Sequence, residues 1–199
     1  MITGNHHDFK SEFELKPFDS KTSGEIVLNG KFFQGKSQAS FCFSWEGFGQ
    51  AKVQDISQGT TAPKRFQLAS STRRDELWKS TCFELFLMPS IDPLSKKYFE
   101  VNLAAMGFWN IYEFESERTG MKPSQNLAGI EFSNVYFQFG PSFCELHLDL
   151  KENELALSAR FGLSAVIKMP NEISYWAMTH KKNKPDFHDQ NSWMGMMHV

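Results

Sequence analysis

The chain has 199 residues, a formal net charge of −2 and 22 % charged residues. This length and balance are ordinary for a globular protein with a substantial core, and they give no support to a nucleic-acid partner. No apolar run of about eighteen residues occurs, so we expect no membrane partner. The first ten residues, MITGNHHDFK, lack the apolar segment of a signal peptide, so the expected location is cytoplasmic.

Strand patterns follow one another along most of the chain. Apolar and polar residues alternate in eight stretches, which are 39–45, 81–87, 98–103, 107–114, 129–139, 143–150, 162–168 and 174–180. Residues 151–160 fit a helix, a strand or a turn nearly equally well, and polar residues 53–72 and 89–97 are predicted loops. Short alternating runs separated by Gly, Pro, Ser and Asn are typical of all-β sandwiches. We predict one antiparallel β-sandwich domain over residues 1–199, with little helix.

The cysteines do not indicate a disulfide framework or a zinc site. Cys42, Cys82 and Cys144 are dispersed, odd in number and without a CxxC pair. Each lies within a strand pattern, which favours the interpretation that they are small buried side chains.

The predicted strands 81–87 and 98–103 each combine an apolar face with a polar one. Their apolar faces, which we expect between the sheets, carry Phe83, Leu85, Leu87, Phe99, Val101 and Leu103. The opposite faces carry Glu84, Glu100 and Asn102, and Trp78 lies six residues before the first of these. Carboxylates and amides can bond sugar hydroxyls, and an aromatic ring can cover a sugar's C–H face. The alternative is a half-exposed sheet face whose polar groups meet water.

The C-terminal stretch SYWAMTHKKNKPDFH places two histidines on either side of a polar loop. His180, Asp186 and His188 would form a two-histidine, one-carboxylate metal set, but they lack the compact spacing of the strong zinc motifs. A catalytic histidine would need a nucleophile, and no GxSxG motif occurs. The remaining interpretations are a ligand contact at a binding rim, or a loop that Asp186 and His188 pin to the sandwich.

Several blocks resemble bacterial DOMON-like proteins, which are single-domain relatives of the family 9 carbohydrate-binding modules. The resemblance extends over about residues 70–190 and includes Leu-Trp at 77–78, Thr-Cys-Phe-Glu at 81–84, Tyr-Phe-Glu-Val-Asn at 98–102 and Lys-Pro-Asp-Phe-His at 184–188. It implies a DOMON-type β-sandwich, a superfamily that binds sugars in some branches and haem in others.

The resemblance also implies roles for single residues. In the carbohydrate-binding branch two aromatic rings enclose the sugar, beside an acid and an Arg-x-Asn pair. Trp78 then corresponds to the first ring, Glu84 to the acid and Asn102 to the Asn, while Glu100 stands at the Arg position. Trp176 is the nearest candidate for the second ring.

We therefore predict a non-catalytic protein that binds a small sugar or glycan fragment. The predicted ligand-binding residues are Trp78, Glu84, Glu100, Asn102, Trp176 and His180. One alternative is a haem or metal site that uses His180 or His188 with Met106, Met121 or Met178. A third is a glycoside-processing enzyme that uses Glu84 and Glu100. We expect no cofactor and a colourless protein, with calcium open as an additional ligand.

Overall fold

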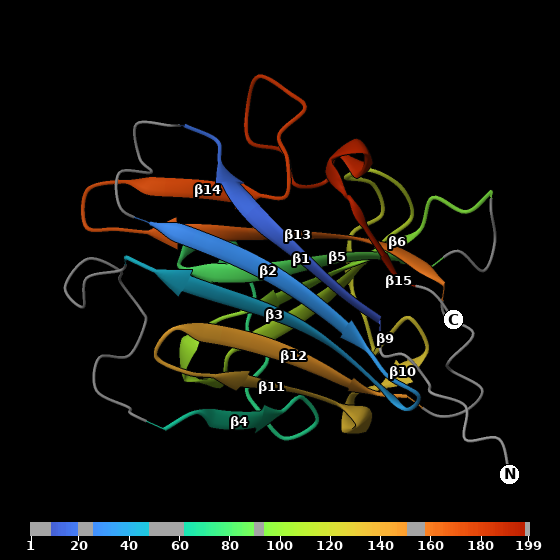
Figure 1. The fold of residues 1–199 in the computed structure, drawn as a ribbon. Coiled ribbons are helices and arrows are strands. Elements are labelled where there is room, and N and C mark those ends of the chain that lie inside the picture. Colours follow the sequence, from blue (N-terminus) through green and yellow to red (C-terminus); the bar gives the residue numbers. More distant parts are fainter. Residues whose placement is uncertain (1–8, 20–25, 48–61, 90–93, 151–157, 198–199) are drawn as a thin grey trace, which may run out of the picture.

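The computed structural model describes residues 9–19, 26–47, 62–89, 94–150 and 158–197 (Figure 1). Strands dominate and 8 % of the chain is helical, so the all-β prediction is confirmed. The strands are β1 (Phe9–Pro17), β2 (Val27–Gln34), β3 (Gln38–Glu46), β4 (Lys64–Gln67), β5 (Cys82–Pro89), β6 (Tyr98–Leu103), β7 (Trp109–Phe114), β8 (Lys122–Pro123), β9 (Asn126–Leu127), β10 (Ile130–Glu131), β11 (Val135–Phe139), β12 (Phe143–Asp149), β13 (Ala159–Lys168), β14 (Ile173–Ala177) and β15 (Gly195–Met197). Short 3-10 turns are η2 (Leu77–Lys79), η3 (Ala105–Gly107), η4 (Phe132–Asn134) and η5 (Gln190–Ser192).

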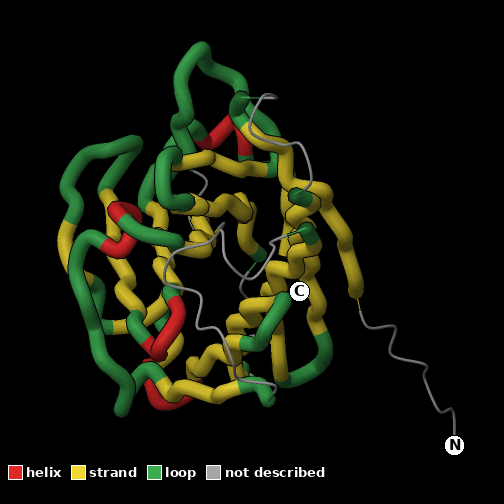
Figure 2. Tube along the Cα trace, turned by 90° about the vertical axis from the view of Figure 1, so that its left-hand side faces the viewer, coloured by secondary structure: helices red, strands yellow, loops and turns green. Residues whose placement is uncertain are grey.

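The longer strands form one antiparallel sheet that curls over on itself. Its first layer has the order β4-β11-β12-β3-β2-β1, and its second layer continues as β14-β13-β5-β6-β7-β8. Strand β1 belongs to both layers, because residues 9–15 pair with β2 while Lys16 and Pro17 pair with β14. Figure 2 shows the strands in this layered arrangement, with loops and short turns outside them.

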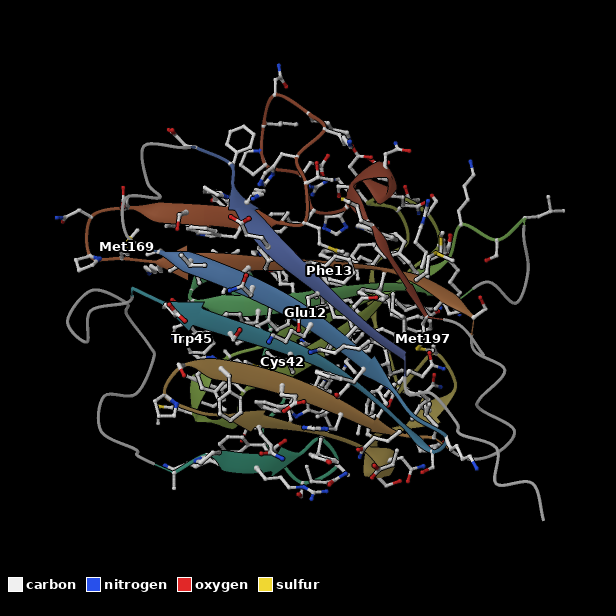
Figure 3. The ribbon with its side chains drawn as sticks, viewed as in Figure 1. Glu12, Phe13, Cys42, Trp45, Met169 and Met197 are labelled. Atoms are coloured by element: carbon white, nitrogen blue, oxygen red, sulfur yellow. The ribbon has the colours of Figure 1, made fainter. Side chains whose placement is uncertain are left out.

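Aromatic side chains fill the space between the two layers. The Phe161 ring on β13 lies 5.0 Å from the Phe32 ring and 5.1 Å from the Phe41 ring, both of which belong to the first layer. Phe83 on β5 stacks on Trp45 of β3, with ring centroids 4.8 Å apart. Trp45 is labelled in Figure 3. The six apolar residues expected between the sheets, Phe83, Leu85, Leu87, Phe99, Val101 and Leu103, are all buried in this core. Alternation therefore predicted the inward face of both strands correctly.

Several elements differ from the sequence prediction. Strands β1 and β2 lie outside the eight predicted stretches, and β4 lies within the predicted loop 53–72. The predicted strand 129–139 is divided by the turn η4, and β14 ends at Ala177 rather than at residue 180. Residues 151–157 lie outside the described part of the chain.

The outer face of the second layer is covered rather than open. The turn η2, residues 115–121 and residues 180–193 lie against it. Side chains of η2 and of residues 187–193 pack on β5, β6 and β7, and the backbone N–H of Arg118 donates to the Tyr98 hydroxyl. Among the described residues, no helix is long and apolar enough to cross a membrane.

Candidate functional site

A row of polar side chains crosses the outer face of the second layer. Strand register places Glu84 directly opposite Asn102 on one side and Ser164 on the other, and Asn102 opposite Asn110. Glu84 is 3 % exposed and Asn102 is 0 % exposed. The three polar groups expected on one outer face do share it, but they are buried there and do not meet bulk water.

The turn η2 holds Trp78 over this face. Leu77 anchors the turn because it is buried against Cys82 and Ala104. Trp78 is half-buried, and its ring meets the ring of Tyr112 edge-on at 5.6 Å. The indole is therefore held in place while part of its surface stays accessible.

Ion pairs tie together the two loops that cover the site. Arg118 donates from Nε and Nη2 to Asp186 Oδ1, at 3.2 and 2.7 Å. Lys182 Nζ contacts Glu117 Oε1 at 2.7 Å and Asp186 Oδ2 at 2.8 Å. Burial opposes ionisation of Asp186, but the hydrogen bonds from Lys182 and Arg118 lower its pKa. Asp186 thus joins residues 115–121 to residues 180–188.

Replacing Asp186 by alanine should loosen both covering loops. Arg118 and Lys182 would lose their shared partner, so we expect faster amide hydrogen exchange in residues 115–121 and 182–188 and unchanged exchange in β5 and β6. Glu76→Ala is the matched control, because its ion pair with Lys79 lies on an exposed turn and should contribute about 0–1 kcal/mol. Unchanged exchange in both loops would contradict the role given to Asp186.

A pocket of about 370 Å³ lies between the covering segments and the sheet. This volume falls in the range of small-molecule sites, roughly 300–1,000 Å³. The sheet supplies Glu84, Glu100, Phe114, Val166 and Tyr175. The covering segments supply Trp78, Arg118, Met121, Pro185, Phe187 and His188. The pocket thus combines several aromatic walls with a few converging polar groups.

Two buried carboxyl groups are the main ionisable groups of the pocket. Burial and the charge of Glu100 raise the pKa of Glu84 well above its ordinary value. Burial also raises the pKa of Glu100 to about 7, although the Asn102 hydrogen bond and the charge of Arg118 lower it. Ser164 Oγ donates to Glu84 Oε2 at 3.4 Å, and Asn102 Nδ2 donates to Glu100 Oε1 at 2.6 Å. Glu84 and Glu100 therefore keep their protons to a higher pH than an ordinary glutamate does.

His188 is held neutral beside Glu100. Burial lowers its pKa to about 4, and the charge of Arg118 acts in the same direction. Its Nδ1 lies 2.6 Å from the Tyr98 hydroxyl, whose own pKa burial raises to about 12. Since the hydroxyl keeps its proton, we assign it as the donor to Nδ1, which leaves the imidazole proton on Nε2, 3.6 Å from Glu100 Oε2.

Three predicted ligand-binding residues lie outside the pocket lining. Asn102 is fully buried beneath it, where it bonds Glu100 and accepts from Cys82 Sγ at 3.3 Å. Trp176 points into the core between the layers, and its Nε1 donates to Ser174 Oγ at 2.9 Å. His180 lies beside β1, with Nε2 2.9 Å from the Lys16 carbonyl oxygen. Only Trp78, Glu84 and Glu100 of the predicted set line the pocket.

The predicted metal ligands are not brought together. Asp186 is engaged by Arg118 and Lys182, while His180 and His188 make the separate contacts described above. Within the described ranges, no group of three or more His, Cys, Asp or Glu side chains could hold a metal ion. Of the predicted histidine–methionine pairs, His188 and Met121 share the pocket, but both ring nitrogens of His188 already face protein groups.

A second hollow, of about 510 Å³, lies on the other side of η2. Its charged side chains, such as Arg74, Glu76 and Lys79, are exposed to solvent. It contains no buried ionisable side chain among its lining residues, so the pocket beside Glu84 and Glu100 is the stronger candidate site.

Sequence reasoning did not single out Tyr175, Phe187 and Arg118 as ligand contacts, and it named Met121 only for the haem or metal alternative. Tyr175 and Trp176 are adjacent aromatic residues on one strand, so alternation alone could not decide which faces the pocket. The register with β13 decides it, because Tyr175 pairs with pocket-lining Val166 and Trp176 with core residue Ala165.

No protein-family model and no curated protein matches the chain. Among solved structures, the chain is similar to a crystal structure of a Bacteroides uniformis protein that has been proposed to bind carbohydrate. The match has a TM-score of 0.54 and 11 % sequence identity, and covers 94 % of this chain and 84 % of the other. At this identity the likeness shows a shared fold.

Proposed function

We propose that the protein is a non-catalytic binding protein for a small sugar or a similar hydroxyl-rich molecule. The observation that carries the proposal is a pocket whose lining combines the rings of Trp78, Tyr175 and Phe187 with two buried carboxyl groups. The rings offer surfaces for the C–H faces of a sugar, and Glu84 and Glu100 offer partners for its hydroxyls. Such a site suits recognition of a single ring or a short glycan fragment.

We propose further that the chain is a DOMON-like relative of the family 9 carbohydrate-binding modules. The β-sandwich architecture and the likeness to a protein proposed to bind carbohydrate support this assignment. In this chain, however, Tyr175 rather than Trp176 offers the second ring of the pocket, and Asn102 acts through Glu100.

Trp78→Ala should remove sugar binding while leaving the fold intact. Removing the indole takes away a stacking surface, but the side chain is only half-buried, so the loss of stability should stay below the ~3–5 kcal/mol of a core Trp. The measurement is calorimetric or fluorescence titration with a panel of mono- and disaccharides. Trp78→Phe is the matched control, and should keep part of the affinity because it keeps a ring.

Two results would contradict the binding proposal. One is the absence of any saturable response of the wild-type protein to the sugar panel. The other is a Trp78→Ala protein that unfolds as easily as a core variant, because Trp78 would then seal the interior and not face a ligand.

A glycoside-processing enzyme is the second candidate, favoured by the state of the two carboxyl groups. Glu100, with its pKa raised to about 7, could donate a proton at neutral pH, as a general acid must. Glu84 lies diagonally across the strand pair from it, since its register partner is Asn102. Release of the aglycone from aryl glycosides, lost in Glu84→Gln and in Glu100→Gln, would favour the enzyme over the binding protein.

A further inference from the structure

We propose that the ligand of the pocket carries a positive charge beside its hydroxyl groups, as an amino sugar does. The inference rests on the proposed function, because it concerns the same pocket and narrows the class of its ligand. Two features of the pocket carry it: buried carboxyl groups that form no ion pair with a described lysine or arginine, and several aromatic side chains in the pocket lining.

Among the described residues, the two carboxyl groups have no lysine or arginine as an ion-pair partner. Ser164, Asn102 and neutral His188 are their polar neighbours. In the described part of the chain, no lysine or arginine forms an ion pair with either glutamate. Buried acids are normally paired, because a buried charge without a partner is costly. A ligand ammonium group would supply the missing partner.

The cations at the rim of the pocket are already balanced. Arg118 and Lys182 are paired with Asp186 and Glu117, so these four charges sum to zero. Arg118 is 56 % exposed at its side chain, and its guanidinium is directed to Asp186. It lowers the pKa of Glu100 without bonding it. The rim therefore presents little net repulsion to a cationic ligand.

The aromatic walls favour the same kind of ligand. Trp78 from η2, Tyr175 from β14, Phe187 from the covering loop and Phe114 from β7 all line the pocket. The face of an aromatic ring attracts a cation, and recognition of ammonium groups commonly uses several such rings together. A neutral sugar could use the same walls, but only a cation would gain from ionisation of the two acids.

A cationic ligand should also make binding depend on pH. The titratable groups facing the two glutamates are Cys82, Tyr98 and Tyr112 from the sheet and His188 and Arg118 from the covering loops. Burial holds Cys82, Tyr98 and Tyr112 protonated and His188 neutral near pH 7. The glutamates are then the groups that change charge, so affinity for a cation should rise from about pH 5.5 to about pH 7 as Glu100 ionises.

The test compares glucosamine with glucose and N-acetylglucosamine by isothermal titration calorimetry at neutral pH. N-acetylglucosamine carries an uncharged acetamide group at the position where glucosamine carries its charged ammonium group. We expect glucosamine to bind at least about tenfold more tightly than either, since a hydrogen bond to a charged group is worth that much. Glu84→Gln and Glu100→Gln should each reduce this preference to about twofold or less. Glu145→Gln, on the first layer, is the control and should retain it in full.

The outcomes separate the inference from the proposed function. Equal affinity for glucose and glucosamine, or a preference that survives in Glu100→Gln, would overturn the inference and leave sugar binding in place. Tighter binding of choline than of glucosamine would support a cationic ligand but contradict the sugar-binding proposal, because the sugar ring would then contribute nothing. Binding of none of these compounds would overturn both.

Discussion

Phe83→Ala is expected to lower the free energy of unfolding by about 3–5 kcal/mol, measured by urea denaturation at neutral pH. Phe83 is fully buried and joins the two layers of the sandwich. Its ring lies 4.8 Å from Trp45, 5.3 Å from Phe43 and 5.8 Å from Phe139, all on the first layer. Alanine would leave a cavity between the layers that three large rings cannot readily fill.

The matched control for this prediction is Phe33→Ala. Phe33 lies on β2 but is only partly buried on the outer face of the first layer, where Lys10 lies over its ring at 5.4 Å. Its removal should cost about 1 kcal/mol or less, as for most surface changes. Similar losses for the two variants would mean that Phe83 does not hold the layers together.

Local alternation predicted the faces of the central strands because a period of two leaves little choice once one face is apolar. It did not single out β4, where pairing rather than side-chain burial defines the strand, and it missed β1 although Phe13 and Leu15 of β1 face the core. In β1 the charged residues Lys10, Glu12, Glu14 and Lys16 alternate on the exposed face. In β4 the side chains are exposed or only partly buried, and the strand is identified by its register with β11.

The candidate site was predictable only as far as the sheet face. Alternation grouped Glu84, Glu100 and Asn102 on one side, and the structure places them there. It could not predict their burial, because the covering loops are held by contacts between distant residues, such as the pair of Arg118 and Asp186, 68 positions apart. Long-range pairs of this kind leave no periodic signal in the sequence.

Glu100→Gln is expected to stabilise the protein at alkaline pH and to leave its stability unchanged at acid pH. The pKa of Glu100 is raised to about 7 in the folded protein, against about 4.3 in an unfolded chain. Below the lower value both states are protonated, so the side chain contributes no pH dependence there. Between the two values the unfolded state ionises first, so the wild-type protein loses stability as pH rises. Glutamine does not ionise and escapes this loss.

The difference between wild type and variant should therefore grow from near zero at about pH 4 to about 2–4 kcal/mol at about pH 8, since each unit of pKa is worth ~1.4 kcal/mol. The pKa of His188 is lowered to about 4, so His188 makes the folded protein more stable as pH rises. This contribution is present in both proteins and cancels in the difference.

Glu145→Gln is the control of opposite sign. The nearby His147, whose Nε2 lies 3.4 Å from Glu145 Oε2, lowers the pKa of Glu145, so the stabilising effect of Glu145 is present above about pH 4, and its removal should destabilise the protein at neutral pH. A stability difference for Glu100→Gln that stays constant from acid to alkaline pH would show that the buried carboxyl is already charged in the folded protein. In that case the pocket would hold its negative charge without a ligand, and binding of a cation would release no proton from Glu100.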